Sequence, residues 1–303
     1  MGQYTASFSV HIHIIRLRRI KINMLHHIKA LEQRSNKERV DYVKELLTKR
    51  GIQYECQPFR LRLLKGENII VTDFCKSNSK NQFLLTAHIN KSFFSPGAND
   101  NASGVSVLLK VAERLKSLQL FDNTSIKIIF FDHEDGLAFV DGSTYYAKNT
   151  DISLINFVFN LDMVGMGNCV ALSPEIKTNA NHYIAQLLKI FTQRKILFFT
   201  YNLPPVFMED HIPFMKRGIA STSLNLFPKK DLEYLKKIVS SSVLAMVKDY
   251  LSLRFNQTSY PMTTMRHRHS DKDVSEFISE DSLELCESIV MDLIQYHIET
   301  LRK

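Results

Sequence analysis

Phe83 to Gly104, FLLTAHINKSFFSPGANDNASG, runs from a strand through a loop into a helix. The apolar residues at 83–87 predict a buried strand that carries His88 at its end. Asp100 ends the loop, and helical spacing of apolar residues follows over 102–115. A histidine at a strand end and an aspartate at a helix entry are typical of α/β folds, which place ligands at the carboxyl edge of the sheet. Alone, such a histidine is more often a structural residue than a ligand.

Strand and helix patterns alternate over the rest of the chain. Apolar runs at 125–131, 155–161 and 219–226 predict buried strands, and the helical spacing at 280–301 predicts a long closing helix. This alternation predicts a three-layer α/β/α sandwich around a largely parallel sheet.

The first third of the chain contains a helical pattern over 24–50 and two strands around a turn predicted at 65–68. Residues 1–23 are expected to be an extension that is poorly ordered, packs as an extra edge strand, or precedes the true start at Met24. The remaining residues, 24–303, are expected to form a single domain, which suits a chain of this length.

Composition and charge narrow the classes of partner. The formal net charge is +8, but the basic residues are scattered and no nucleic-acid-binding motif is present, so we expect a solvated basic surface and no nucleic-acid partner. The four cysteines form no C-x-x-C pair, which is typical of reduced thiols. No run approaches the roughly 18 apolar residues of a membrane span, and the N-terminus lacks the features of a secretory signal. We therefore expect a cytoplasmic protein without membrane association; the sequence does not indicate its oligomeric state.

Further acids and a histidine follow the predicted strands or lie in polar loops. With the first two residues, they form a set of two histidines and four carboxylates: His88, Asp100, Glu134, Asp135, Asp162 and His269. This set matches the needs of two divalent ions, because zinc accepts imidazole and carboxylate ligands. In two-metal sites the ions share a bridging carboxylate, and another carboxylate nearby acts as the base. The adjacent Glu134 and Asp135 can divide these roles, one binding metal and the other handling protons.

Five fragments carry a resemblance to a known family: AHIN, SPGANDNASG, FFDHEDGLAFVDGS, NLDMVG and HSDKD. In this order and at these separations, they resemble the M28 family of zinc aminopeptidases, over essentially residues 40–300. The resemblance implies the mixed-sheet α/β/α fold of zinc exopeptidases, which is phosphorylase/hydrolase-like, and two zinc ions. By matched motif, it implies Asp100 as the bridging ligand, His88, Asp135, Asp162 and His269 as further ligands, and Glu134 as the general base.

The implied reaction is the removal of N-terminal residues from peptides. Two zinc ions would acidify a shared water and polarise the peptide carbonyl, while Glu134 would accept the proton of the water and return it to the leaving amine. The implied substrates are peptides with a free N-terminus, which would bind near one metal.

Three residues depart from the family pattern. Asn90 stands where the family usually has an aspartate two residues after the first histidine, and its amide can accept a hydrogen bond but brings no charge. The usual Glu-Glu pair is Glu134-Asp135, so that ligand is one methylene shorter. His133 precedes this pair where a small residue is common. The lost charge at Asn90 predicts weaker metal affinity or activity, and the shorter side chain of Asp135 predicts a shifted ligand geometry.

Two positions have alternative interpretations. His267 competes with His269 for the last ligand position, but His269 fits the His-Ser-x-x-Asp spacing better, which leaves His267 as a solvated loop residue. The segment EDHIPF at 209–214 resembles glutaminyl cyclases of the same fold, so Asp210 is a candidate proton shuttle. Alternatively, Asp210 caps a helical turn that begins near Pro213.

Two other functions remain open. One is a single-zinc glutaminyl-peptide cyclase, although the chain has no tryptophan, which pockets of that kind typically use. The other is a non-catalytic binding protein on the same fold, with Asn90 and Asp135 as early signs of drift. Metal stoichiometry distinguishes them: two ions for the peptidase, one for the cyclase, and none or a structural ion for the binding protein.

Overall fold

The computed structural model describes residues 23–61, 64–75, 79–120, 124–133, 142–174, 181–201, 209–240, 245, 248 and 259–302. Of the predicted N-terminal extension at 1–23, residues 1–22 lie outside these residues, and Asn23 is the N-cap of the first described helix, Met24–Glu32. Glu134 and Asp135 also lie outside them.

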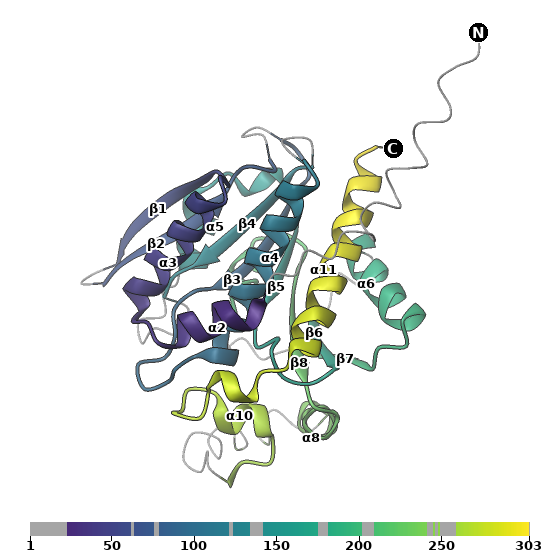
Figure 1. Ribbon diagram of the computed structural model, residues 1–303. Coiled ribbons are helices and arrows are strands. Elements are labelled where there is room, and N and C mark those ends of the chain that lie inside the picture. Colours follow the sequence, from purple (N-terminus) through teal and green to yellow (C-terminus); the bar gives the residue numbers. More distant parts are fainter. Residues whose placement is uncertain are drawn as a thin grey trace.

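A mixed sheet forms the centre of the molecule (Figure 1). The described strands form one eight-stranded sheet in the order β1-β2-β4-β3-β5-β8-β6-β7. The four central strands, β4, β3, β5 and β8, are mutually parallel, whereas β1-β2, β2-β4 and β8-β6 are antiparallel pairs. The strand bounds are β1 Tyr54–Leu61, β2 Leu64–Val71, β3 Gln82–His88, β4 Ile126–Phe131, β5 Ile155–Leu161, β6 Cys169–Pro174, β7 Phe198–Thr200 and β8 Ser221–Phe227.

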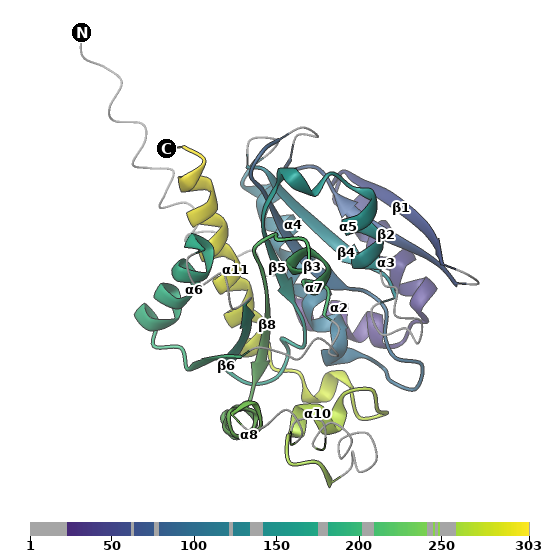
Figure 2. The same ribbon diagram turned by 180° about the vertical axis from the view of Figure 1, so that it is seen from behind.

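Helices cover both faces of the sheet, as the two opposite views show (Figures 1 and 2). One face carries α2, α4, α6 and α11, and the other carries α5 and α7. The predicted α/β/α sandwich around a mixed, largely parallel sheet is therefore confirmed. The helix bounds are α2 Met24–Glu32, α3 Asn36–Lys49, α4 Ser103–Ser117, α5 Gly142–Asn149, α6 His182–Gln193, α7 Ile212–Met215, α8 Lys229–Val239, α10 Thr263–His267 and α11 Glu280–Thr300.

Strand β4 shows why the sequences of the central strands are continuous apolar runs. Ile128 and Phe130 are buried in the core beneath α4 and α11, while Ile129 and Phe131 are buried in the core beneath α5 and α7. Because a helix layer lies on each face, successive side chains of a central strand both leave water. In the described part of the chain, none of the helices is both long and apolar enough to cross a membrane.

Two local predictions in the first third were wrong. The helix predicted over 24–50 is divided into α2 and α3, because Ser35 caps α3 in a reciprocal box with Glu38. The turn predicted at 65–68 lies within β2, where Gly66 pairs with Phe59 of β1. The polar composition of 65–68 is typical of a turn, but these residues continue the antiparallel pairing of β1 with β2.

Candidate metal centre

The strand register brings two of the predicted ligands to one edge of the sheet. In the parallel pair β3-β5, Thr86 is opposite Asn160, so His88 at the end of β3 is level with Asp162 just beyond β5. On the other side of β3, Phe131 at the end of β4 pairs with His88. The chain that leads to Glu134 therefore leaves the sheet beside His88, although Glu134 itself is outside the described residues.

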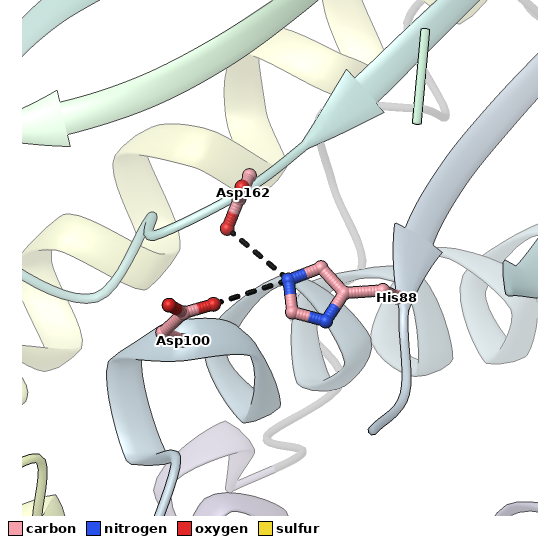
Figure 3. A group of neighbouring side chains, drawn as sticks. All are labelled: His88, Asp100 and Asp162. Atoms are coloured by element: carbon pink, nitrogen blue, oxygen red, sulfur yellow. Dashed lines mark ion pairs between the residues drawn. The ribbon is translucent and has the colours of Figure 1, made fainter. Parts of the chain in front are cut away.

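Asp100 completes a buried group of three side chains (Figure 3). It lies in the short helical turn η1 (Ala98–Ala102), whose backbone leaves helical geometry at Asp100 and Asn101. Asp100 Oδ1 is 3.1 Å from His88 Nε2, and Asp162 Oδ1 is 3.5 Å from the same nitrogen. Three separate elements of the fold thus direct one nitrogen and two carboxylate oxygens to a common point.

The orientation of the His88 ring suits a ligand. Its Nδ1 lies 3.2 Å from the backbone carbonyl oxygen of Asn90, which fixes Nδ1 as the donor and leaves Nε2 directed at the two aspartates. This contact is made by the backbone of Asn90, and a backbone carbonyl is present whichever side chain stands at position 90.

The second carboxylate oxygen of Asp100 faces the other way. Arg268 Nε donates a hydrogen bond to Asp100 Oδ2 at 2.8 Å, and His269 Nε2 lies 3.2 Å from the same oxygen. His269 adopts a left-handed backbone conformation with φ 57°, a region that histidine enters more readily than most residues. The structure therefore brings His269 to the predicted ligands. Arg268 was not predicted from the sequence.

His267 has a different environment. Its ring is tilted against that of Phe277, with 4.4 Å between the ring centroids, and it is half-buried at the end of α10. The expectation of a solvated loop residue was therefore wrong. The preference for His269 over His267 agrees with the contacts of His269.

Burial and neighbouring charges shift the pKa values of the two aspartates in opposite directions. Burial alone would raise the pKa of Asp100, but Arg268 and the two histidines hold it well below its usual range. The pKa of Asp162 is raised, because burial outweighs the contact with His88 and the Asp100 charge adds to the effect. Asp100 therefore carries negative charge in the centre of the group.

Amide and hydroxyl side chains join the loop of Asp100 to the loop of Asp162. Asn101 Nδ2 donates to the carbonyl of Leu161, Ser103 Oγ accepts from the amide of Val164, and Asn99 Oδ1 accepts from the amide of Gly165. The sequence motifs NDNASG and NLDMVG are thus two halves of one hydrogen-bonded unit. Because these bonds fix backbone groups within three residues of Asp162, the unit sets the separation of the two carboxylates.

Gly104 allows this close approach. A Cβ at position 104 would lie 2.6 Å from Asn101 Oδ1 and 2.7 Å from the carbonyl oxygen of Leu161. Because real Cβ atoms do not approach so closely, a larger residue here would push the two loops apart.

Asp273, the last residue of HSDKD, is hydrogen-bonded to the backbone of the loop that carries Asp100. Its carboxylate accepts hydrogen bonds from the backbone amides of Asn99 and Asp100, at 2.7 and 3.1 Å. Burial and the nearby Asp100 charge raise the pKa of Asp273 to about 6, although these two hydrogen bonds oppose the shift. The motif therefore supplies a positioning residue as well as His269.

Asp210 is fully buried in the segment that precedes α7. The residue at the N-cap of α7 is His211, which makes no side-chain capping bond, so the capping interpretation of Asp210 was wrong. The neighbouring His211 Nδ1 lies 3.2 Å from Glu209 Oε2. Burial raises the pKa of Tyr201, and the charges of Glu209 and Asp162 add to this effect, so each of these acids lies within electrostatic reach of Tyr201.

The donor set of this group fits zinc. His88, Asp100 and Asp162 offer ligand atoms that all lie within 4.8 Å of one another, and zinc accepts one imidazole and two carboxylates. Oδ1 of Asp100 and Oδ1 of Asp162 are buried, and neither accepts a hydrogen bond of ordinary geometry from the described part of the chain. Two buried carboxylate oxygens directed at one point are costly unless a cation lies between them.

Comparisons with known proteins agree with this geometry. The model of peptidase family M28 matches residues 68–294. Aminopeptidase YwaD of Bacillus subtilis is 36% identical over 147 residues, which cover 46% of this chain and 30% of that protein. The match therefore spans less than a third of that aminopeptidase.

Solved structures share the fold. A Zn-dependent exopeptidase from Parabacteroides distasonis has a TM-score of 0.65 at 19% identity, covering 89% of this chain and 96% of that one. The glutaminyl cyclase of Porphyromonas gingivalis has a TM-score of 0.64 at 20% identity, covering 91% of this chain and 99% of that one. Since the family model covers most of the sequence and the fold agrees, the chain belongs to peptidase family M28.

Proposed function

We propose that this protein is a zinc-dependent aminopeptidase that removes N-terminal residues from peptides. The convergence of His88, Asp100 and Asp162 at the carboxyl edge of the sheet carries the proposal. These residues would hold one ion, and Asp100, Asp135 and His269 would hold a second. When bound, zinc supplies a Lewis acid that polarises the scissile carbonyl and acidifies water.

The chain's own residues would position the reactants and move the proton. Phe131, the last residue of β4, pairs with His88. Glu134, three residues later in the sequence, would take a proton from the attacking water and return it to the leaving amine. The bonds between the loops of Asp100 and Asp162 would keep the carboxylates in place during this step.

The second candidate is a glutaminyl-peptide cyclase with one zinc ion. Two observations favour it: the structural similarity to a glutaminyl cyclase, and the burial of Asp210, the candidate proton shuttle. The chain lacks tryptophan, and its family model and its sequence relative are peptidases, so we rank it second.

Metal content and two activities, measured together, test the proposal. Purified protein is assayed for bound zinc, for hydrolysis of a panel of aminoacyl-anilides, and for cyclisation of a peptide with an N-terminal glutamine. The proposal expects zinc, anilide hydrolysis and loss of hydrolysis in Glu134→Gln with the metal retained. Cyclisation without hydrolysis would establish the cyclase. Absence of both metal binding and activity after zinc addition would favour a binding protein.

A further inference from the structure

The two oxygens of Asp100 have different partners. Oδ1 faces His88 Nε2 at 3.1 Å, beside Asp162. Oδ2 faces His269 Nε2 at 3.2 Å and accepts the hydrogen bond of Arg268. An ion held by His88, Asp100 and Asp162 would use Oδ1, and an ion on the His269 side would need Oδ2. The Arg268 guanidinium contacts Oδ2, the oxygen that faces His269.

Local structure holds Arg268 in this position. Its backbone amide caps α10 by donating to the carbonyl of Thr264, and the amides of Thr263 and Thr264 donate to the buried Asp231 of α8. The left-handed backbone at His269 then lets two consecutive side chains reach one oxygen. The Arg268 side chain is 27% exposed, so most of it is enclosed by the protein.

The charge of Arg268 acts on the whole centre. A guanidinium remains positive at every pH relevant to folded proteins, so Arg268 does not release Asp100 Oδ2 by losing a proton. It favours the charged forms of Asp100, Asp162 and Tyr201, which shows that all three lie within reach of its field. A cation on the His269 side would meet this charge directly and would compete for the same oxygen.

We propose that Arg268 is an internal competitor for the second metal ion. The His88, Asp100 and Asp162 group binds one divalent ion first, and a second ion binds beside His269 only by displacing the Arg268 guanidinium from Asp100 Oδ2. This inference rests on the proposed metal-dependent function and adds a control of metal loading to it. Occupancy of the second position then depends on the zinc concentration over a range in which the first position is already full.

Zinc binding alone tests the inference, without an activity assay. Titration calorimetry with Zn²⁺ and equilibrium dialysis with metal analysis give the stoichiometry and the stepwise affinities of the full chain. Arg268→Gln and Arg268→Met both remove the charge, with side chains that differ in polarity. Arg266→Gln removes the same charge two residues earlier on α10, where Arg266 donates to Thr263 Oγ1. Circular dichroism melting confirms that each variant is folded.

The inference expects two unequal steps in the natural protein, with the second at least roughly tenfold weaker. Arg268→Gln and Arg268→Met should each strengthen the second step by about tenfold or more, and change the first step less. Arg266→Gln should leave both steps within about twofold.

Other results overturn it. Two ions bound with equal affinity, and no change in either Arg268 variant, would leave the proposed function intact and refute the competition. Weaker zinc binding in the Arg268 variants would show that Arg268 supports the metal site. Absence of zinc binding in the natural protein would instead contradict the proposed function itself.

Discussion

Two histidines, His88 and His297, are each fully buried, yet their surroundings differ in kind. His297 on α11 donates through Nε2 to the carbonyl of Thr124 at 2.8 Å, and its Nδ1 accepts from the hydroxyl of Tyr183 at 2.6 Å. His88 has a backbone carbonyl at Nδ1, but two carboxylates face its Nε2. One ring is a neutral group with a neutral partner at each nitrogen, and the other faces concentrated negative charge.

The difference shows how a structural histidine is distinguished from a candidate ligand. Neutral partners at both nitrogens satisfy a buried imidazole completely and leave nothing for a cation to bind. Carboxylates gathered around one nitrogen are satisfied only by positive charge. The contrast makes separate predictions for metal binding and for stability.

The largest effect is expected at Asp100, whose two oxygens face both sides of the metal centre. Asp100→Asn removes the negative charge and one acceptor, so zinc affinity and hydrolysis of the best aminoacyl-anilide should fall by about a hundredfold or more. Calorimetry and kcat/KM measure these losses. Hydrolysis within about twofold of the natural protein would show that Asp100 is not a ligand.

The pH dependence of stability should depend on His297. Burial lowers the pKa of His297 from 6.5 to about 4, with a partial opposing effect from Thr124. The unfolded chain takes up this proton near pH 6.5 and the folded protein only near pH 4. Stability is therefore lost as the pH falls between these values, by about 3 kcal/mol from this group.

Urea unfolding at pH 7 and pH 4.5 measures this loss. His297→Gln removes the titrating group, so its stability should change less over this range than that of the natural protein. Equal pH slopes in the two proteins would contradict the assignment.

His297→Gln should also destabilise the protein at pH 7, by about 1–3 kcal/mol, because one amide cannot keep both hydrogen bonds. Its zinc affinity should not change. His182→Gln is the matched control, because His182 contacts the hydroxyl of Tyr296 at the surface, and we expect a change within about 0.5 kcal/mol. A loss of zinc binding in His297→Gln would remove the distinction between the two histidines.

The smallest effect is expected at Asp273. Asp273→Asn keeps one acceptor oxygen and loses the other, so one of the amides of Asn99 and Asp100 loses its bond. We expect a loss of about 1 kcal/mol in unfolding free energy and a several-fold fall in kcat. Unchanged values of both would show that the loop of Asp100 does not need this support.

Much of this arrangement could be predicted from the sequence, because it depends on local patterns. The strands are apolar runs, and polar residues at their ends mark the carboxyl edge of the sheet, so His88 and Asp162 could be placed together. The motifs also favoured His269 over His267. The break between α2 and α3 could also have been predicted, because Ser35 and Glu38 have the spacing of a capping box, which marks the start of a helix.

The remainder depends on contacts between distant segments. Arg268 meets Asp100 across 168 positions, and no local pattern distinguishes it from the neighbouring Arg266. The contact of Asn90 is made by its backbone, which a sequence does not show. The asparagines around Asp100 were visible as a motif, but their partners in the loop of Asp162 appear only in the fold.

Zinc titration of His88→Gln beside His297→Gln tests the central claim most directly, that the His88, Asp100 and Asp162 group is a metal site. The natural protein and His297→Gln should bind zinc with similar affinity, while His88→Gln should bind the first ion about a hundredfold more weakly or not at all. Zinc binding by His88→Gln at the affinity of the natural protein would contradict the claim.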